Sequence, residues 1–290
     1  MRLLQIGSIV TALVAAFAPL SARAQRDRFF TTSDGVTLHY IEAGQGPTLV
    51  LIPGWTMPAW IFAPQIAAFS QRYHVVALDP RSQGDSDVAS SGYNQDRRGQ
   101  DIAELLDRLG PQPVALAGWS LGVLDSLAYV HTNGDSRLAG LVLIDNSVGE
   151  DPAPRPEPRA PLPRRRRPAR PVTREVLMRN FVAGMFVRAQ PPTYIDDLTE
   201  ACLRTPPLAA ALLLSYPVPR TYWKEAVYAT DKPILYIVRP RLAGQAANLA
   251  AHDPYAEAVV LNDVGHAMFV DNPTEFNSIL QSFLTRRVWR

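Results

Sequence analysis

The sequence has a single cysteine, Cys202, among its 290 residues. An internal disulfide is therefore excluded, and the core alone must hold the protein together even in an oxidising compartment. The sequence also has little net charge, because 29 basic and 27 acidic side chains leave a balance of +2. Such a balance gives no general case for nucleic acid or a membrane surface as a partner.

The chain also lacks an apolar run as long as the ~20 residues that a membrane-spanning helix needs. Its N-terminus has one early cation, Arg2, then an uncharged apolar run from Ile6 to Leu20, then small residues at Ala22 and Ala24. This order is typical of a secretory signal peptide. We predict that residues 1–24 are cleaved, that the mature protein is periplasmic or secreted, and that it has no membrane span. A retained N-terminal anchor is the alternative.

Short apolar runs, rich in β-branched residues and without alternation, recur along the rest of the chain. Such runs suit strands buried on both faces of a mainly parallel sheet. Helical spacing lies between them, as at Asp96–Leu109, and a hairpin at Arg28–Ala43 precedes them. This alternation predicts an α/β fold with a doubly wound sheet, whose ligands bind beyond the carboxyl ends of the strands. The runs are Thr48–Ile52, His74–Leu78, Val114–Ala117, Leu141–Ile144, Ile234–Val238 and Ala258–Leu261.

The interval between Ile144 and Ile234 is far longer than one strand-helix-strand connection requires. It opens with Pro152–Pro171, where proline and arginine dominate. We predict an extended surface strap for this segment, because it has too few apolar residues to fold alone. Its run Arg164–Arg167 is expected to be solvated, and docking to an anionic partner is the alternative.

Helical segments return between Val172 and Trp223, and we interpret them as a small cap inserted above the sheet. The predicted organisation is an α/β core made of residues 25–148 and 226–290, interrupted by a strap and cap at residues 149–225.

The segment VALAGWSLG, Val114–Gly122, joins a buried strand, the motif G-x-S-x-G and the start of a helix. Its glycines allow a sharp turn and close backbone packing, which leaves the serine on a strained tip at the edge of the sheet. The motif alone is weak, but between a strand and a helix it predicts Ser120 as a nucleophile.

A serine hydroxyl is a poor nucleophile at neutral pH and needs a base nearby. Of the five histidines, His266 lies in a glycine-containing loop directly after the last predicted strand. It shares the carboxyl edge of the sheet with Ser120 and follows the serine in chain order, as a triad of this fold requires. We therefore predict His266 as the base and interpret the other histidines as structural.

Four motifs together carry a resemblance to a known family. The chain resembles α/β-hydrolases of the esterase, haloperoxidase-like and dehalogenase-like branch over nearly all of its mature length except the strap. The resemblance implies an acyl-enzyme on Ser120, the main-chain N–H groups of Trp55 and Leu121 as oxyanion donors, and neither a cofactor nor a metal. The motifs are LIPGW at residues 51–55, LDPRSQGDSD at 78–87, GWSLG at 118–122 and DVGHAMFVDNP at 263–273.

Two positions depart from the family's pattern. Pro53 stands where histidine usually precedes the glycine, and Ser82 stands where glycine usually follows the arginine. We interpret Asp79 and Arg81 as bracing of this second loop. Dehalogenases and epoxide hydrolases of this fold have aspartate in place of the serine in the nucleophile turn, residues 118–122 here, which is called the elbow below. Ser120 therefore argues against their chemistry.

The third triad member is missing from its usual place, because the loop from Arg239 to Asn248 has no acidic residue. Asp145 directly follows the preceding buried strand, whose carboxyl end is adjacent to the elbow. We therefore predict Asp145 as the acid, with Glu150 as the reserve and Asp263 as a weaker candidate.

The cap is rich in apolar and aromatic residues, which points to apolar ligands. We predict Trp119, Trp60 and Phe186 as substrate-binding residues and the hydrolysis of small to medium apolar carboxylic esters as the function. A cofactor-free perhydrolase or haloperoxidase-like enzyme and a lactone hydrolase are enzymatic alternatives. A hydrolase-like binding protein without activity is the non-enzymatic one.

Overall fold

The computed structural model describes residues 25–153, 172–215 and 217–290. The predicted signal peptide, residues 1–24, and the arginine run Arg164–Arg167 lie outside these ranges.

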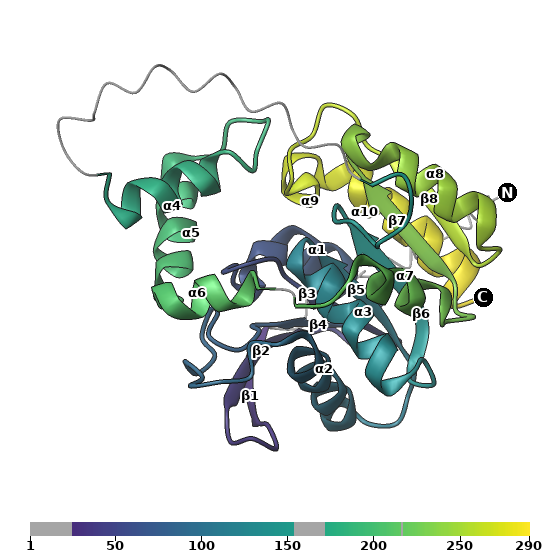
Figure 1. Ribbon diagram of the computed structural model, residues 1–290, viewed down its shortest axis with the longest axis horizontal. Helices are drawn as coiled ribbons and strands as arrows, with labels where there is room; N and C mark the ends of the chain where they lie inside the picture. The colour runs from purple at the N-terminus through teal and green to yellow at the C-terminus, as the bar shows by residue number, and fades with distance from the viewer. Residues whose placement is uncertain (1–24, 154–171, 216) are drawn as a thin grey trace, which may run out of the picture.

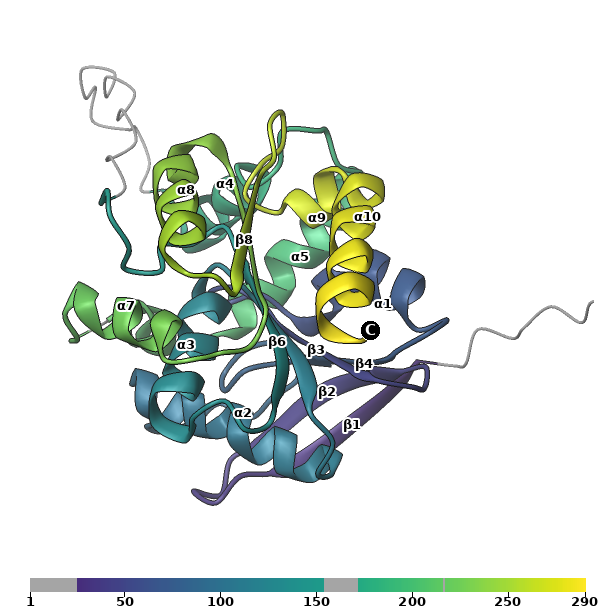
Figure 2. The same ribbon diagram turned by 90° about the vertical axis from the view of Figure 1, so that its right-hand side faces the viewer.

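Eight strands form one twisted sheet in the order β1-β2-β4-β3-β5-β6-β7-β8 (Figures 1 and 2). The hairpin β1-β2 is antiparallel and pairs antiparallel with β4, whereas all pairings from β4 to β8 are parallel. The predicted α/β fold with a doubly wound, mainly parallel sheet is confirmed. The strands are β1 Arg26–Thr31, β2 Thr37–Ala43, β3 Thr48–Ile52, β4 His74–Leu78, β5 Val114–Trp119, β6 Leu138–Ile144, β7 Ile234–Val238 and β8 Ala256–Val260.

Helices cover both faces of the sheet (Figure 2). One face is covered by α1 Ala63–Phe69, α9 Met268–Asp271 and α10 Pro273–Phe283, and the other by α2 Gln95–Leu109, α3 Leu121–Asn133, α7 Arg220–Tyr228 and α8 Ala243–His252. Successive strand residues point to opposite faces. In β3, for example, Leu49 and Leu51 join one buried cluster while Val50 and Ile52 join the other. Both faces of the central strands are buried, and this explains why their sequences are apolar throughout instead of alternating between apolar and polar residues.

The helices α4 Arg174–Ala183, α5 Pro192–Arg204 and α6 Pro207–Leu213 stand to one side of this sandwich (Figure 1). Met178 of α4 and Cys202 of α5 belong to the same buried cluster as Met57 of the core. The next helix, α7, begins within the range predicted as cap, yet its residues Trp223 and Val227 pack with the core cluster around α3.

The segment after β7 was predicted as a loop, and this prediction is wrong. Residues Pro240–Leu242 form a short 3-10 helix, and α8 follows from Ala243. The segment is rich in alanine, which favours helix, and Leu242, Ala246 and Leu249 are buried on one side of it. Within the described ranges, no helix is long and apolar enough to cross a membrane.

Candidate active site

A sharp turn between β5 and α3 presents Ser120. Its backbone is left-handed, with φ 54° and ψ −118°, a conformation that costs on the order of 1–3 kcal/mol. Neighbouring glycines make the turn possible. A Cβ added at Gly118 would lie 2.1 Å from the carbonyl oxygen of Gly122, and one added at Gly122 would lie 2.3 Å from that of Ile52. The G-x-S-x-G motif is thus a steric requirement of the turn.

Ser120, His266 and Asp145 form a continuous hydrogen-bonded series. The Nε2 atom of His266 lies 2.8 Å from the Oγ atom of Ser120, and its Nδ1 atom lies 2.7 Å from the Oδ2 atom of Asp145. The three residues follow β5, β8 and β6 respectively, so they meet at the carboxyl ends of parallel strands. With Nδ1–H donating to the carboxylate, Nε2 is free to accept the serine proton.

Asp145 is completely buried and has a left-handed backbone, φ 51°. Its main-chain N–H donates to the carbonyl of Ile237, 2.9 Å away, which continues the β6-β7 pairing. Arg239 contacts the carboxylate twice, through its main-chain N–H to Oδ1 at 3.1 Å and through Nε to Oδ2 at 2.6 Å. Burial alone would raise the pKa of Asp145, but the hydrogen bond and charge of His266, together with Arg239, hold it below its ordinary value.

The two reserve acids lie elsewhere. Glu150 is buried, and its carboxylate accepts hydrogen bonds from Tyr228 at 2.6 Å and Lys224 at 2.9 Å. Burial would raise its pKa, but these bonds and one from the main chain of Asp151 outweigh it and lower the pKa to about 2. Asp263 is exposed. Neither has a hydrogen bond to His266 in the described part of the chain.

The histidine loop, residues 261–267 between β8 and α9, is held from two sides. The indole Nε1–H of Trp119 donates to the carbonyl of His266 at 2.8 Å. The buried carboxylate of Asp271 accepts from the main-chain N–H of Gly265 at 2.6 Å and from that of Val187, in the cap, at 2.9 Å. Asp271 thereby ties the loop that carries His266 to the segment after α4.

The predicted oxyanion donors flank the serine. Gly54 approaches it so closely that an added Cβ would lie 3.0 Å from the Cβ of Ser120. The main-chain N–H groups of Trp55 and Leu121, which follow Gly54 and Ser120, have no hydrogen-bond partner among the residues described. Two unpaired amides beside a nucleophile form the arrangement that stabilises a developing oxyanion.

Gln83, which the sequence analysis did not single out, supports the loop at residues 53–57, which carries the donor of Trp55 and is called the oxyanion loop below. It is 1% exposed. Its Oε1 accepts from the main-chain N–H of Thr56 at 2.6 Å, and its Nε2 donates to the carbonyls of Gly54 at 3.2 Å and Met57 at 3.4 Å. The sequence offered one signal for this role, an uncharged polar residue inside LDPRSQGDSD. The partners of Gln83 lie more than twenty positions away in the sequence, so no local pattern reveals them.

Replacing Gln83 with methionine should therefore impair catalysis more than folding. Methionine keeps the approximate volume but leaves the N–H of Thr56 unpaired and removes the donor to the carbonyls of Gly54 and Met57, so the loop loses its fixed geometry. We expect kcat for an activated ester to fall about tenfold to a hundredfold. The larger figure is comparable to the effect of losing one oxyanion donor. KM should change little. The exposed Gln112 provides the control, as Gln112→Met. A wild-type kcat in Gln83→Met would contradict the assigned role.

The predicted substrate-binding residues do not share one environment. Trp119 is 1% exposed and packs edge-on against Phe269 at 5.0 Å, so it supports the histidine loop and presents no open face. This placement departs from the prediction, because an elbow tryptophan is covered by the helices on its side of the sheet.

Trp60 and Phe186 are both half-buried and are linked by Tyr194 of α5, with ring centroids 5.8 Å and 6.0 Å from it. They form an aromatic row where the cap meets the core. Trp60 also lines a surface pocket of about 390 Å³ with residues of α5, namely Asp197, Glu200, Ala201 and Arg204. Within the described ranges, the ring of His266 packs against Trp119 at 5.1 Å, whereas Trp60 and Phe186 both contact Tyr194.

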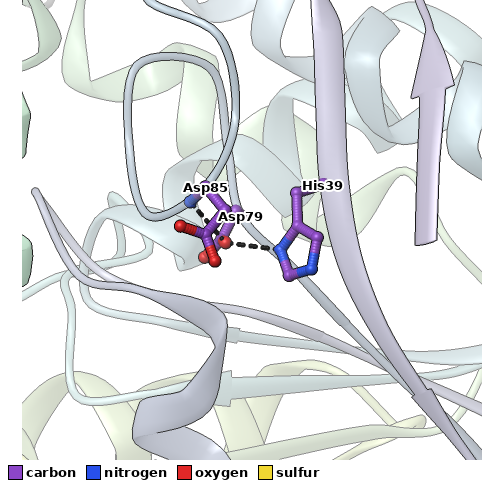
Figure 3. A group of neighbouring side chains, drawn as sticks. All are labelled: His39, Asp79 and Asp85. Atoms are coloured by element: carbon purple, nitrogen blue, oxygen red, sulfur yellow. Dashed lines mark hydrogen bonds and ion pairs between the residues drawn. The ribbon is translucent and has the colours of Figure 1, made fainter. Parts of the chain in front are cut away.

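One group of side chains in the described residues has the ligand types of a metal site, namely His39, Asp79 and Asp85 (Figure 3). The carboxylate of Asp79, however, already accepts from Nδ1 of His39 at 2.7 Å and from the main-chain N–H groups of Ala59 at 2.5 Å and Asp85 at 2.8 Å. These bonds tie β2, the loop after β4 and the segment after the oxyanion loop together. Asp79 thus braces the loop, which is the role predicted for it.

Comparison with known proteins places this geometry in a family. A model of the alpha/beta hydrolase family matches residues 49–279. The soluble epoxide hydrolase of Corynebacterium sp. (strain C12) is 30% identical over 102 residues, 35% of this chain and 36% of its own length. The non-heme chloroperoxidase of Kitasatospora aureofaciens is 34% identical over 115 residues, 39% of this chain and 42% of its own length. The chain thus matches less than half the length of these curated relatives.

Among solved structures, a candidate aryl esterase from Burkholderia cenocepacia superposes with a TM-score of 0.78 and 22% identity, covering 91% of this chain and all of the other. At that identity the likeness shows the fold alone. The family match covers most of the chain, including the elbow and the histidine loop, and it agrees with the resemblance inferred from the motifs. This protein belongs to the alpha/beta hydrolase family.

Proposed function

We propose that this protein is a serine hydrolase that cleaves carboxylic esters through an acyl-enzyme on Ser120. The observation that carries the proposal is the hydrogen-bonded series from Ser120 through His266 to Asp145, with distances of 2.8 Å and 2.7 Å. A nucleophile, a base and an orienting acid in this order are the parts that acyl transfer requires.

In the proposed mechanism, Oγ of Ser120 attacks the ester carbonyl carbon while its proton passes to Nε2 of His266. The carbonyl oxygen becomes an oxyanion, which the amides of Trp55 and Leu121 stabilise. When the ester C–O bond breaks, the proton on Nε2 passes to the leaving alcohol. Water then attacks the acyl-enzyme with His266 again as base, which releases the acid and restores Ser120.

The proposed substrates are small to medium esters with an apolar acyl part. This rests on the cap, which lies against the oxyanion loop. The ring of Trp55 packs edge-on against Phe181 of α4 at 5.2 Å, and its Nε1–H donates to the carbonyl of Ala210 in α6 at 2.7 Å. A loop held between two apolar cap helices favours an apolar group beside the reacting carbonyl.

Labelling with a fluorophosphonate tests the proposal, because the reagent forms a covalent bond only with an activated serine. We expect a stoichiometric adduct on the peptide that contains Ser120, together with turnover of p-nitrophenyl acetate and butyrate. Ser120→Ala should lose both, whereas the exposed Ser282→Ala should keep both. If folded wild-type protein shows neither an adduct nor turnover, the protein is a hydrolase-like binding protein instead.

The similarity to a non-heme chloroperoxidase favours a second candidate, a perhydrolase. In that reaction hydrogen peroxide replaces water in attacking the acyl-enzyme and a peracid is released. The same residues would serve both reactions, so the assay for peracid in acetate and peroxide separates them. Peracid formation that competes with hydrolysis at millimolar peroxide would support the second candidate.

A further inference from the structure

One oxygen of Asp145 serves two positively polarised groups. Its Oδ2 atom lies 2.7 Å from Nδ1 of His266 and 2.6 Å from Nε of Arg239. The proposed mechanism uses only the first of these contacts. The arginine directly follows β7, at the place where an acid is usual in this family and is absent from this sequence.

Arg239 also fixes the plane of the carboxylate. Its main-chain N–H binds Oδ1 at 3.1 Å while its side chain binds Oδ2, so a single residue holds both oxygens. A two-point contact of this kind restrains rotation about the carboxyl group. The restraint acts on a residue whose backbone is left-handed, φ 51°.

The charge of Arg239 opposes the effect of the Asp145 carboxylate on the imidazole of His266. A carboxylate beside an imidazole favours the protonated ring, whereas a guanidinium remains charged at every accessible pH. A guanidinium on the same oxygen therefore reduces the net negative charge that the ring experiences, without breaking its hydrogen bond.

The other buried carboxylate at the loop that carries His266 is Asp271, which accepts from the main-chain N–H of Gly265 at 2.6 Å and is unchanged in every variant proposed below. Tyr236 of β7 is the remaining titratable neighbour, and it is buried, with its hydroxyl donating to the carbonyl of Asn146 at 2.7 Å. Burial, and to a lesser extent the charge of Asp145, raises its pKa far above the ordinary value, so it stays neutral. Arg241 is exposed, and its charge acts to lower the pKa of Tyr236 as the smallest of the three causes.

We propose that Arg239 is a positioning residue, which aims the carboxylate of Asp145 at His266 and shares the negative charge of that carboxylate with the imidazole. This inference rests on the proposed function of the triad. Its consequence is that loss of the guanidinium should change both the rate and the pH profile of activity.

The pH dependence of fluorophosphonate labelling tests the proposal independently of the natural substrate. Arg239→Met keeps the stem and the main-chain N–H but loses the charge and Nε–H. Its acid limb should move to higher pH by about one unit, because an imidazolium next to an unopposed carboxylate loses its proton later. Its plateau rate should fall about tenfold, because the carboxylate is less firmly aimed. Arg239→Lys, which keeps a charge without the planar donor, should show a smaller shift of the limb.

Arg241→Met, on the same turn, is the matched control and should reproduce the wild-type profile. Arg239→Gln provides a second uncharged variant that retains a donor, should Arg239→Met fail to fold, and its acid limb should also move upward. Profiles of Arg239→Met or Arg239→Gln that superimpose on the wild type would overturn the inference. An unlabelled wild-type protein would instead refute the proposed function.

Discussion

Replacement of Asp145 by asparagine is expected to lower kcat for an activated ester about ten-thousandfold, the effect of the equivalent change in a well-studied triad. The neutral amide can donate to Nδ1 of His266, which places the ring proton on Nε2 and blocks acceptance from Ser120. Asparagine also provides no charge to stabilise the imidazolium that forms as Ser120 attacks. Steady-state kinetics with p-nitrophenyl acetate, together with a thermal melt, measure the effect.

The reserve acids supply the controls for this experiment. Glu150→Gln removes a buried carboxylate that binds Lys224 and Tyr228, so it should reduce stability while leaving kcat within about threefold of wild type. The exposed Asp263→Asn should change neither. Near-full activity of Asp145→Asn, or a collapse of kcat in folded Glu150→Gln, would show that the acid has been assigned to the wrong residue.

Gly122→Ala is the second substitution with a large expected effect. The added methyl group would lie 2.3 Å from the carbonyl oxygen of Ile52 and 2.8 Å from that of Pro53. Both are backbone atoms that lead into the oxyanion loop, so no side-chain rotation relieves the clash. We expect a loss of about 1–3 kcal/mol in the free energy of unfolding and a loss of about a hundredfold in labelling rate, as for a displacement of about 1 Å.

Chemical denaturation and fluorophosphonate labelling measure these two effects separately. Gly184→Ala is the matched control, since that glycine ends α4 with φ −70° and its added Cβ would meet nothing closer than 3.1 Å. It should behave nearly as wild type. Retention of the wild-type labelling rate in Gly122→Ala would mean that the elbow and the oxyanion loop are not in the tight contact described.

The local parts of the site were predictable because each is written in adjacent residues. The nucleophile turn requires glycines on both sides of Ser120 for steric reasons, so the motif and its flanking strand identified it. His266 was found by its position after the last strand. The α8 helix was not predicted, although the alanine content of Ala243–His252 favours helix.

Other contacts join residues far apart in the chain, and no short pattern records them. Gln83 reaches the oxyanion loop from a different strand connection, and Arg239 reaches Asp145 across 94 positions. Trp119 was predicted to face the ligand, but its burial depends on how α9 and α10 pack beneath it. Side-chain direction in each case follows from packing between elements.

The sequence by itself determined the α/β fold, Ser120 and His266 as the candidate nucleophile and base, and Asp145 as the predicted acid, since these depend on strand periodicity and on which residues directly follow each strand. Only the tertiary structure showed the contact between Asp145 and His266 and what else holds that carboxylate. The physical reason is that β6 lies between β5 and β7 in the sheet, so Asp145 is placed against both the elbow and Arg239 by strand order, which local sequence does not encode.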